Sequence, residues 1–471
     1  MKLMDREILR LALPSILANI TVPLVGMVDI AVAGHLSGGA AAFIGAISVG
    51  SMFFDLLYWN FAFLRAGTGG LTAQAYGRQD WSQCVRIFIR GVVLSLLMAL
   101  LVLLIQWPFI HYGLSLVKAS DEVKELAQKY FLLRVWAAPA TIALMSFRGW
   151  FVGMQDTVSS MYTDLTVNIS NVVASIVLSL GVGRWEGMGF SGIAAGTVVA
   201  QYLGLLYACG AVSGKYRHLF KGLGKEDFTQ ALDTSGLRTF FSMNLDLLLR
   251  SLALTAVYIC FTVISARYGD LMLAASSIIM KLLMIFSFFT DGFAYAAQAL
   301  CGRFIGALDR RSTAYSVKRV FVWSMGIGLS FIFIYWVLGT PLVRMMTSDT
   351  QVVEACRQFL PWLLLMPPVG CAAFTWDGIY EGATASRPMR NATVASFAGF
   401  LGVWWLLRYV LVAPALASDA LCGAEADPAS LRAPALAIHC LMAAYFVHLA
   451  VRTVWLGITC RRDILTAPFA E

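Results

Sequence analysis

Charged residues are scarce in this chain. Asp, Glu, Lys and Arg make up 13% of its 471 residues, whereas soluble domains carry about 25%. Hydrophobic residues make up 59%, and they form stretches longer than the ~20 residues needed to cross a bilayer core. The composition therefore excludes a soluble globular protein and predicts an integral membrane protein.

The sequence also lacks the motifs of soluble enzymes and ATPases. It contains no Walker phosphate loop, no HExxH and no G-x-S-x-G. The Gly-rich segment 67–70 lies inside an apolar run with no strand before it, which excludes a dinucleotide-binding loop. Because no ATP site is present, we expect transport driven by an ion gradient rather than enzyme chemistry.

The nine cysteines include no C-x-x-C pair, and most lie in apolar runs. This pattern favours small core residues over a disulfide framework or a metal site. We therefore expect no cofactor other than a coupling ion, H⁺ or Na⁺.

The apolar stretches predict an all-α integral membrane protein with twelve transmembrane helices. Their approximate bounds are 8–33, 42–72, 85–112, 126–152, 158–183, 187–213, 237–267, 271–302, 314–340, 354–380, 390–416 and 435–458.

The second half of the chain repeats motifs of the first half in the same order. Each pair is separated by roughly 224–229 residues, a spacing that indicates two structural repeats: Arg148-Gly149 with Asp377-Gly378, Gly153 with Gly382, Ser120-Asp121 with Ser348-Asp349, Pro139 with Pro368, and Ala73-Gln74-Ala75 with Ala297-Gln298-Ala299. We predict two pseudo-symmetric six-helix lobes, residues 1–225 and 226–471. Because both lobes must enter the membrane from the same side, the repeat is parallel, about an axis along the membrane normal.

Lys and Arg residues predict the orientation. If the N-terminus is cytoplasmic, the outer loops carry roughly half as many of them as the inner segments, so the positive-inside rule places both termini in the cytoplasm. The net charge of +8 then belongs to short loops beside anionic lipid and does not indicate a nucleic-acid partner.

Several ionisable residues lie inside the predicted spans. An ionised side chain at mid-membrane costs about 2.5–3.5 kcal/mol on insertion scales, so each is expected to face a cavity or a partner. The candidates are Asp29, Asp55, Arg65, Asp164, Asp246, Arg250, Lys281, Asp291, Asp377 and Glu381. Asp246 and Arg250 stand four residues apart on one helix face, where they can neutralise each other. Together with Lys281 and Asp291 they form a predicted polar patch of the C-terminal lobe.

Asp29 differs from the other candidates because no basic residue is near it in the sequence. Burial disfavours the charged form of a carboxylate, so we predict that Asp29 takes up a proton and releases it when the site is rehydrated. Asn168 and Asn171, on one face of the fifth span, are candidate amide partners. A structural hydrogen-bonding role for Asp29 and interhelical hydrogen bonds for the two asparagines remain open alternatives.

Four segments resemble one known family. They are residues 22–36, 63–75, 244–251 and 291–296, and they are similar to the multidrug and toxic compound extrusion (MATE) family in its DinF-like branch. The resemblance covers essentially the whole chain. It implies two six-helix lobes in a V shape and exchange of H⁺ or Na⁺ for organic, often cationic, compounds.

The resemblance also implies site residues. Asp29 matches the family's protonation site in the first lobe, and Asn171 and Thr197 match polar positions near it. Two positions depart from the pattern: Ser175 stands where relatives often carry a second aspartate, and Gln298 stands where the branch commonly has glutamate. The second departure leaves any coupling in the C-terminal lobe to Asp246 or Asp291.

The leading hypothesis is an ion-coupled antiporter, with H⁺ favoured over Na⁺, that exports organic compounds across the inner (plasma) membrane. Its expected partners are small organic substrates and the lipid bilayer, without nucleic acid, and it is expected to be a monomer. The alternative is a flippase for a lipid-linked oligosaccharide or peptidoglycan precursor, which would carry a basic cavity for pyrophosphate. The deep basic residues Arg65, Arg250 and Lys281 are few and accompanied by acids, which favours the antiporter. A membrane-embedded enzyme is the least favoured reading, because no clustered His or Cys site is present.

Overall fold

The computed structural model describes residues 2–36, 39–117, 119–221, 230, 233–347, 349–421 and 432–469. The predicted lobe boundary between residues 225 and 226 therefore lies outside the described residues, as does Ser348 of the repeated Ser-Asp pair.

The first half of the chain forms six membrane-spanning segments from ten helical elements. These are α1 (Lys2–His35), α2 (Ala40–Trp59), α3 (Phe63–Gly77), α4 (Trp81–Ser115), α5 (Asp121–Arg134), the 3-10 turn η1 (Val135–Ala137), α6 (Ala138–Gly153), α7 (Thr157–Leu180), α8 (Phe190–Lys215) and the short α9 (Arg217–Phe220).

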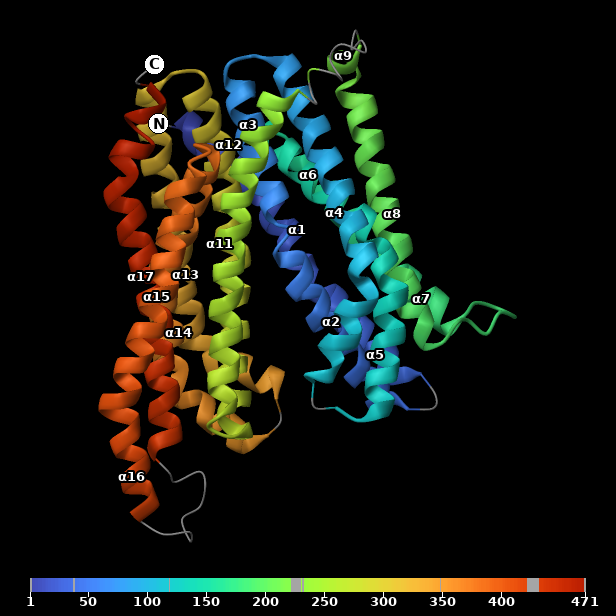
Figure 1. The fold of residues 1–471 in the computed structure, drawn as a ribbon, viewed down its shortest axis with the longest axis vertical. Helices are drawn as coiled ribbons and strands as arrows, with labels where there is room; N and C mark the ends of the chain where they lie inside the picture. Colours follow the sequence, from blue (N-terminus) through green and yellow to red (C-terminus); the bar gives the residue numbers. More distant parts are fainter. Residues whose placement is uncertain are drawn as a thin grey trace.

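The second half repeats this plan. Its elements are α11 (Thr234–Ala266), α12 (Asp270–Gly306), α13 (Arg310–Met346), α14 (Thr350–Gly382), α15 (Ser386–Leu407), the π-helical turn η2 (Arg408–Val412), α16 (Ala413–Leu421), α17 (Arg432–Asp463) and the 3-10 turn η4 (Ala467–Phe469). Figure 1 shows the two halves side by side, with both chain termini at the same end of the molecule.

The predicted fold class is confirmed. Twelve helical segments of the described chain are long and apolar enough to cross a membrane, and the described residues contain no strand, only an isolated bridge between Val182 and Trp185. The predicted single helix over 42–72 is instead two helices, α2 and α3, joined by a turn at residues 60–62. Asn60 stands at this break: its amide donates to the carbonyl of Leu56 at 2.6 Å and its own oxygen accepts from Thr255 at 3.4 Å.

The helix caps show the register of the repeat. Asp80 caps α4 and Asp309 caps α13, each accepting a backbone N–H bond three residues on, and the two are 229 residues apart. Ser120 and Asp349 cap α5 and α14 with the same separation. The predicted pairing of Ala73-Gln74-Ala75 with Ala297-Gln298-Ala299 is therefore wrong by five residues, because an Ala-Gln-Ala string occurs by coincidence near the end of α12.

The two halves pack through glycines related by the same offset. A Cβ atom at Gly77 would collide with the carbonyl oxygen of Arg303, and one at Gly306 would collide with that of Gln74. Both contacts cross from one half to the other, and each is the 229-residue equivalent of the other. Only glycine permits such close approach of two helix backbones, so the repeated glycines are the packing surface about the pseudo-twofold axis.

Side-chain amides add hydrogen bonds to this interface. Gln74 donates through Nε2 to the carbonyl of Gly382 at 3.1 Å and to Thr384 Oγ1 at 3.2 Å, and Gln155 donates to the carbonyl of Ala299 at 2.8 Å. All of these groups lie near the ends of helices on the side of the chain termini. Figure 1 shows the ribbons of the two halves moving apart toward the opposite end.

Candidate functional site

Asp29 lies in the second half of α1 with 4% of its surface exposed. Ser175 of α7 donates from Oγ to Asp29 Oδ1 at 3.1 Å. Asp29 is thus held by a hydroxyl group at the position where the family resemblance led us to note the missing second carboxylate. A hydroxyl stabilises the ionised form of Asp29 without adding a second negative charge.

Asn171 and Thr197 lie beside this pair. Asn171 donates through Nδ2 to Thr197 Oγ1 at 3.0 Å, and the hydroxyls of Thr197 and Ser175 both donate to the carbonyl of Ile193, at 3.3 and 3.5 Å. The Oδ1 atom of Asn171 is buried with no partner among the described residues. The structure therefore brings the four predicted residues of the first lobe into one cluster, in which Ser175 alone contacts Asp29.

Arg134 adds a cation to this cluster, and sequence reasoning missed it. Its guanidinium donates to Tyr130 Oη at 2.7 Å and to Ser51 Oγ at 3.4 Å, and its charge acts on the carboxylates of Asp29 and Asp55. Arg134 lies inside the predicted span 126–152, so the search for ionisable residues within spans could have found it. Asp29 is isolated from cations in the sequence but not in space.

The first half of α1 is attached to the second lobe. Asp5 pairs with Arg319 of α13 at 2.6 Å, and Glu7 pairs with Arg303 of α12 at 3.4 Å. Farther along, the amide of Asn19 donates to the carbonyl of Phe288 at 3.2 Å.

The second half of α1 is attached to the first lobe. Asn168 of α7 donates to Thr21 at 2.5 Å, and the Asp29–Ser175 bond follows two turns later. One helix therefore connects the two lobes, and Asp29 lies in the part that holds the first lobe. A change of charge at Asp29 alters that attachment directly.

A second cluster of charged residues lies where α3 meets the second lobe. Arg250 of α11 pairs with Asp377 at 2.7 Å and with Glu381 at 3.7 Å, both on α14. Arg65 of α3 reaches the other oxygen of Glu381 at 3.8 Å, and Arg452 of α17 reaches Asp377 at 3.5 Å. These five residues, named here the junction network, are mostly buried, so their charges depend on one another for compensation.

Gln298 and Tyr295 support Arg65 in this network. Gln298 accepts from Arg65 at 3.5 Å and donates to the carbonyl of Ala66 at 2.9 Å, while the guanidinium of Arg65 lies 4.2 Å from the centre of the Tyr295 ring. In the adjoining part of the first lobe, Arg148 pairs with Asp164 at 2.5 Å.

The predicted polar patch of the second lobe is divided by the structure. Asp246 pairs with Arg390 at 2.5 Å and accepts from Ser386 at 3.0 Å, so the expectation that Asp246 and Arg250 neutralise each other is wrong. Sequence spacing alone could not show that helices α14 and α15 offer each residue a closer partner.

Lys281 and Asp291 also separate. Lys281 is exposed and outside the junction network, and its charge acts on Asp55 of α2 in the other lobe. Asp291 lies within electrostatic range of Arg65 and Arg250 but contacts neither. Arg250 and Asp291 thus remain near each other, whereas Asp246 and Lys281 belong to other parts of the lobe.

The described residues contain no group of three or more His, Cys, Asp or Glu side chains arranged to hold a metal ion. The chemistry that the two clusters can support is proton or cation binding at a carboxylate and charge pairing between helices. Both are reversible binding steps that suit a conformational cycle.

Comparisons with known proteins agree with this architecture. The family model described as MatE matches residues 14–177 and 247–405. The chain is 34% identical over 412 residues to DNA damage-inducible protein F of Escherichia coli (strain K12), covering 86% of this chain and 88% of that protein.

Two solved structures share the fold. One, described as an outward-facing conformation of a multidrug resistance MATE family transporter of the MOP superfamily, gives a TM-score of 0.81 at 16% identity, covering 98% of this chain and 96% of that one. The other, described as MATE in the bent conformation, gives a TM-score of 0.80 at 16% identity, covering 99% and 97%.

Proposed function

The chain belongs to the MATE family and is therefore a membrane transporter rather than an enzyme, and we propose that it is an antiporter that exports organic, often cationic, compounds in exchange for protons. The observation that carries this proposal is the buried carboxylate of Asp29, held by Ser175 on the helix that connects the two lobes.

Arg134 supports the proton over sodium as the coupling ion. A sodium ion bound at Asp29 would add a positive charge beside the guanidinium of Arg134, and this repulsion is strong in a medium of low dielectric constant. A proton instead neutralises Asp29 and leaves the Arg134 charge solvated by Tyr130 and Ser51. Asn171 and Thr197 supply neutral oxygens in the same cluster, but Asp29 is the one carboxylate among the four predicted residues there.

The structure offers a route from proton binding to motion. Ionised Asp29 attracts Arg134 and accepts from Ser175, so the second half of α1 is held to the first lobe. Protonation removes the attraction to Arg134 and weakens that attachment, while the first half of α1 stays paired with Arg303 and Arg319 of the second lobe. The two lobes can then move relative to each other.

We further propose that the protein lies in the inner (plasma) membrane with both termini cytoplasmic, as the positive-inside rule indicates. Under this orientation the closed interface through Gly77 and Gly306 lies on the cytoplasmic side, so the conformation is outward-facing. Small organic compounds reach the cavity from the cytoplasm only after this interface opens.

The junction network argues against the alternative flippase. A pyrophosphate group requires free basic side chains, but Arg65, Arg250 and Arg452 each contact a carboxylate. An anionic lipid-linked precursor would have to displace Asp377 or Glu381 from these arginines.

Transport in proteoliposomes tests the proposed function. With a fluorescent organic cation inside and a pH gradient imposed without sodium, we expect efflux of the cation with simultaneous proton uptake. A sodium gradient at constant pH should produce no efflux above that of protein-free liposomes. Efflux that requires sodium and ignores the pH gradient would contradict proton coupling.

A further inference from the structure

The repeat relates the Asp29 site to a different kind of site in the second lobe. Tyr258 of α11 stands 229 residues after Asp29, and Met284 of α12 stands 229 residues after Asp55. Both first-lobe carboxylates lie in the field of Arg134. The corresponding place in the second lobe is therefore lined by an aromatic ring and a thioether instead of acids.

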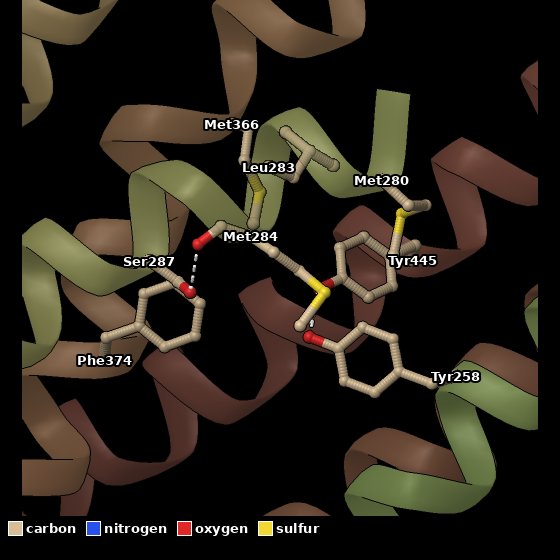
Figure 2. A pocket seen from close by; sticks show the side chains of 8 residues that line it. All are labelled: Tyr258, Met280, Leu283, Met284, Ser287, Met366, Phe374 and Tyr445. Carbon is tan, nitrogen blue, oxygen red and sulfur yellow. Dashed lines mark hydrogen bonds between the residues drawn. The ribbon is translucent and has the colours of Figure 1, made fainter. Parts of the chain in front are cut away.

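These second-lobe residues surround a pocket between α11, α12, α14 and α17. Figure 2 shows the thioether of Met284 extending toward the hydroxyl ends of Tyr258 and Tyr445, whose Oη atoms are 3.3 Å apart. Phe374 and Met366 complete the apolar wall. The empty volume is about 190 Å³, including the part open to solvent, so a bound ring must displace a side chain. Methionine is suited to this because it is unbranched and flexible and its sulfur contacts aromatic rings favourably.

An acid lies beside this pocket. On α12 the residues Met280, Met284, Ser287 and Asp291 are spaced three or four apart, so they form one stripe along the helix. The carboxylate of Asp291 also acts electrostatically on the hydroxyl of Tyr258. No described residue forms an ion pair with Asp291, whereas Asp377 and Glu381 both contact arginines.

We propose that this pocket, with Asp291, binds the exported compound as an aromatic amine, with its ring between Tyr258, Tyr445 and the methionines and its protonated nitrogen at Asp291. The inference rests on the proposed function and adds the substrate class. Ser287 and Asp291 are one helical turn apart, about 5.4 Å, so the ring and the ammonium group should be separated by two or three methylene groups.

The pocket also contacts the first lobe. The ring of Tyr258 lies 5.8 Å, centroid to centroid, from the ring of Trp59 on α2, and Thr255, one turn earlier on α11, donates to Asn60. A ligand that moves Tyr258 therefore acts on the contact between the lobes. Substrate in the second lobe and a proton in the first lobe would in this way meet at one interface.

Equilibrium binding to the purified full-length protein tests this proposal. The probe is 2-(1-naphthyl)ethylammonium, compared with 2-cyclohexylethylammonium, which lacks the aromatic ring, and 2-(1-naphthyl)ethanol, which lacks the charge. We expect the wild type to bind the first compound at least about tenfold more tightly than either analogue.

Two variants separate the contributions. Tyr258→Leu should weaken binding of the naphthyl ammonium about tenfold and leave the cyclohexyl compound nearly unchanged. Asp291→Asn should remove the preference for the ammonium over the alcohol. Tyr162→Leu, an exposed tyrosine of α7, is the matched control and should bind all three compounds as the wild type does. Size-exclusion elution and thermal melting confirm that each variant is folded.

Unchanged binding by folded Tyr258→Leu and Asp291→Asn would overturn the proposal, as would a wild type that binds none of the three compounds. Because the measurement uses no ion gradient, it is independent of the coupling ion. Proton-driven export of other compounds without naphthyl ammonium binding would reject this substrate class alone, whereas binding at the pocket without ion-driven transport would reject the antiporter.

Discussion

The substitution Asp29→Asn is expected to abolish gradient-driven efflux while leaving the amount of folded protein unchanged. Asparagine has the size of aspartate, and its amide oxygen can still accept the bond from Ser175 Oγ that is 3.1 Å long in the wild type. It cannot take up a proton, so the cycle loses its coupling step. Efflux from cells or inverted vesicles should fall to the level without transporter, with membrane expression measured in parallel.

Asp270→Asn is a suitable control for this variant. Asp270 is exposed at the start of α12, and the same change there should leave efflux intact. Normal efflux by well-expressed Asp29→Asn protein would remove Asp29 from the coupling role.

The second large effect is expected for Arg250→Ala. The Arg250 side chain is 11% exposed and contacts Asp377 and Glu381, so its removal leaves buried carboxylates with less compensation. Breaking a buried ion pair by removing one partner costs roughly 3–5 kcal/mol. We expect a sharp drop in the yield of folded protein and a lower thermal midpoint in detergent.

An exposed ion pair gives the comparison. Arg357 pairs with Glu354 at 3.0 Å, with side chains 46% and 67% exposed, and exposed pairs contribute about 0–1 kcal/mol. Arg357→Ala should therefore keep nearly the wild-type yield. If Arg250→Ala folds normally but changes drug affinity, the junction network binds substrate. If neither yield nor transport changes, the network has neither role.

The fold was largely predictable from the sequence, because membrane-spanning helices are determined by the length and polarity of local segments. The twelve spans and the two-fold repeat follow from that pattern. The break between α2 and α3 did not follow, because hydropathy does not register the hydrogen bonds of Asn60. The five-residue error in pairing Gln74 with Gln298 arose because small-residue strings recur along helices.

The candidate sites were predictable only in part. Asp29, Ser175, Asn171 and Thr197 meet in the structure as the family resemblance implies. Partner choice among the charged residues depends on packing between helices far apart in the chain. No spacing rule could have paired Asp246 with Arg390 across 144 positions.

The central claim is that a proton at Asp29 and a cationic substrate exclude each other. The most direct test is the affinity of the purified protein for a cationic substrate as a function of pH, in the wild type and in Asp29→Asn. We predict that the wild-type affinity falls as the pH is lowered and that the Asp29→Asn affinity does not depend on pH. A wild-type affinity that is independent of pH but falls when sodium is added would contradict proton coupling and make sodium the coupling ion.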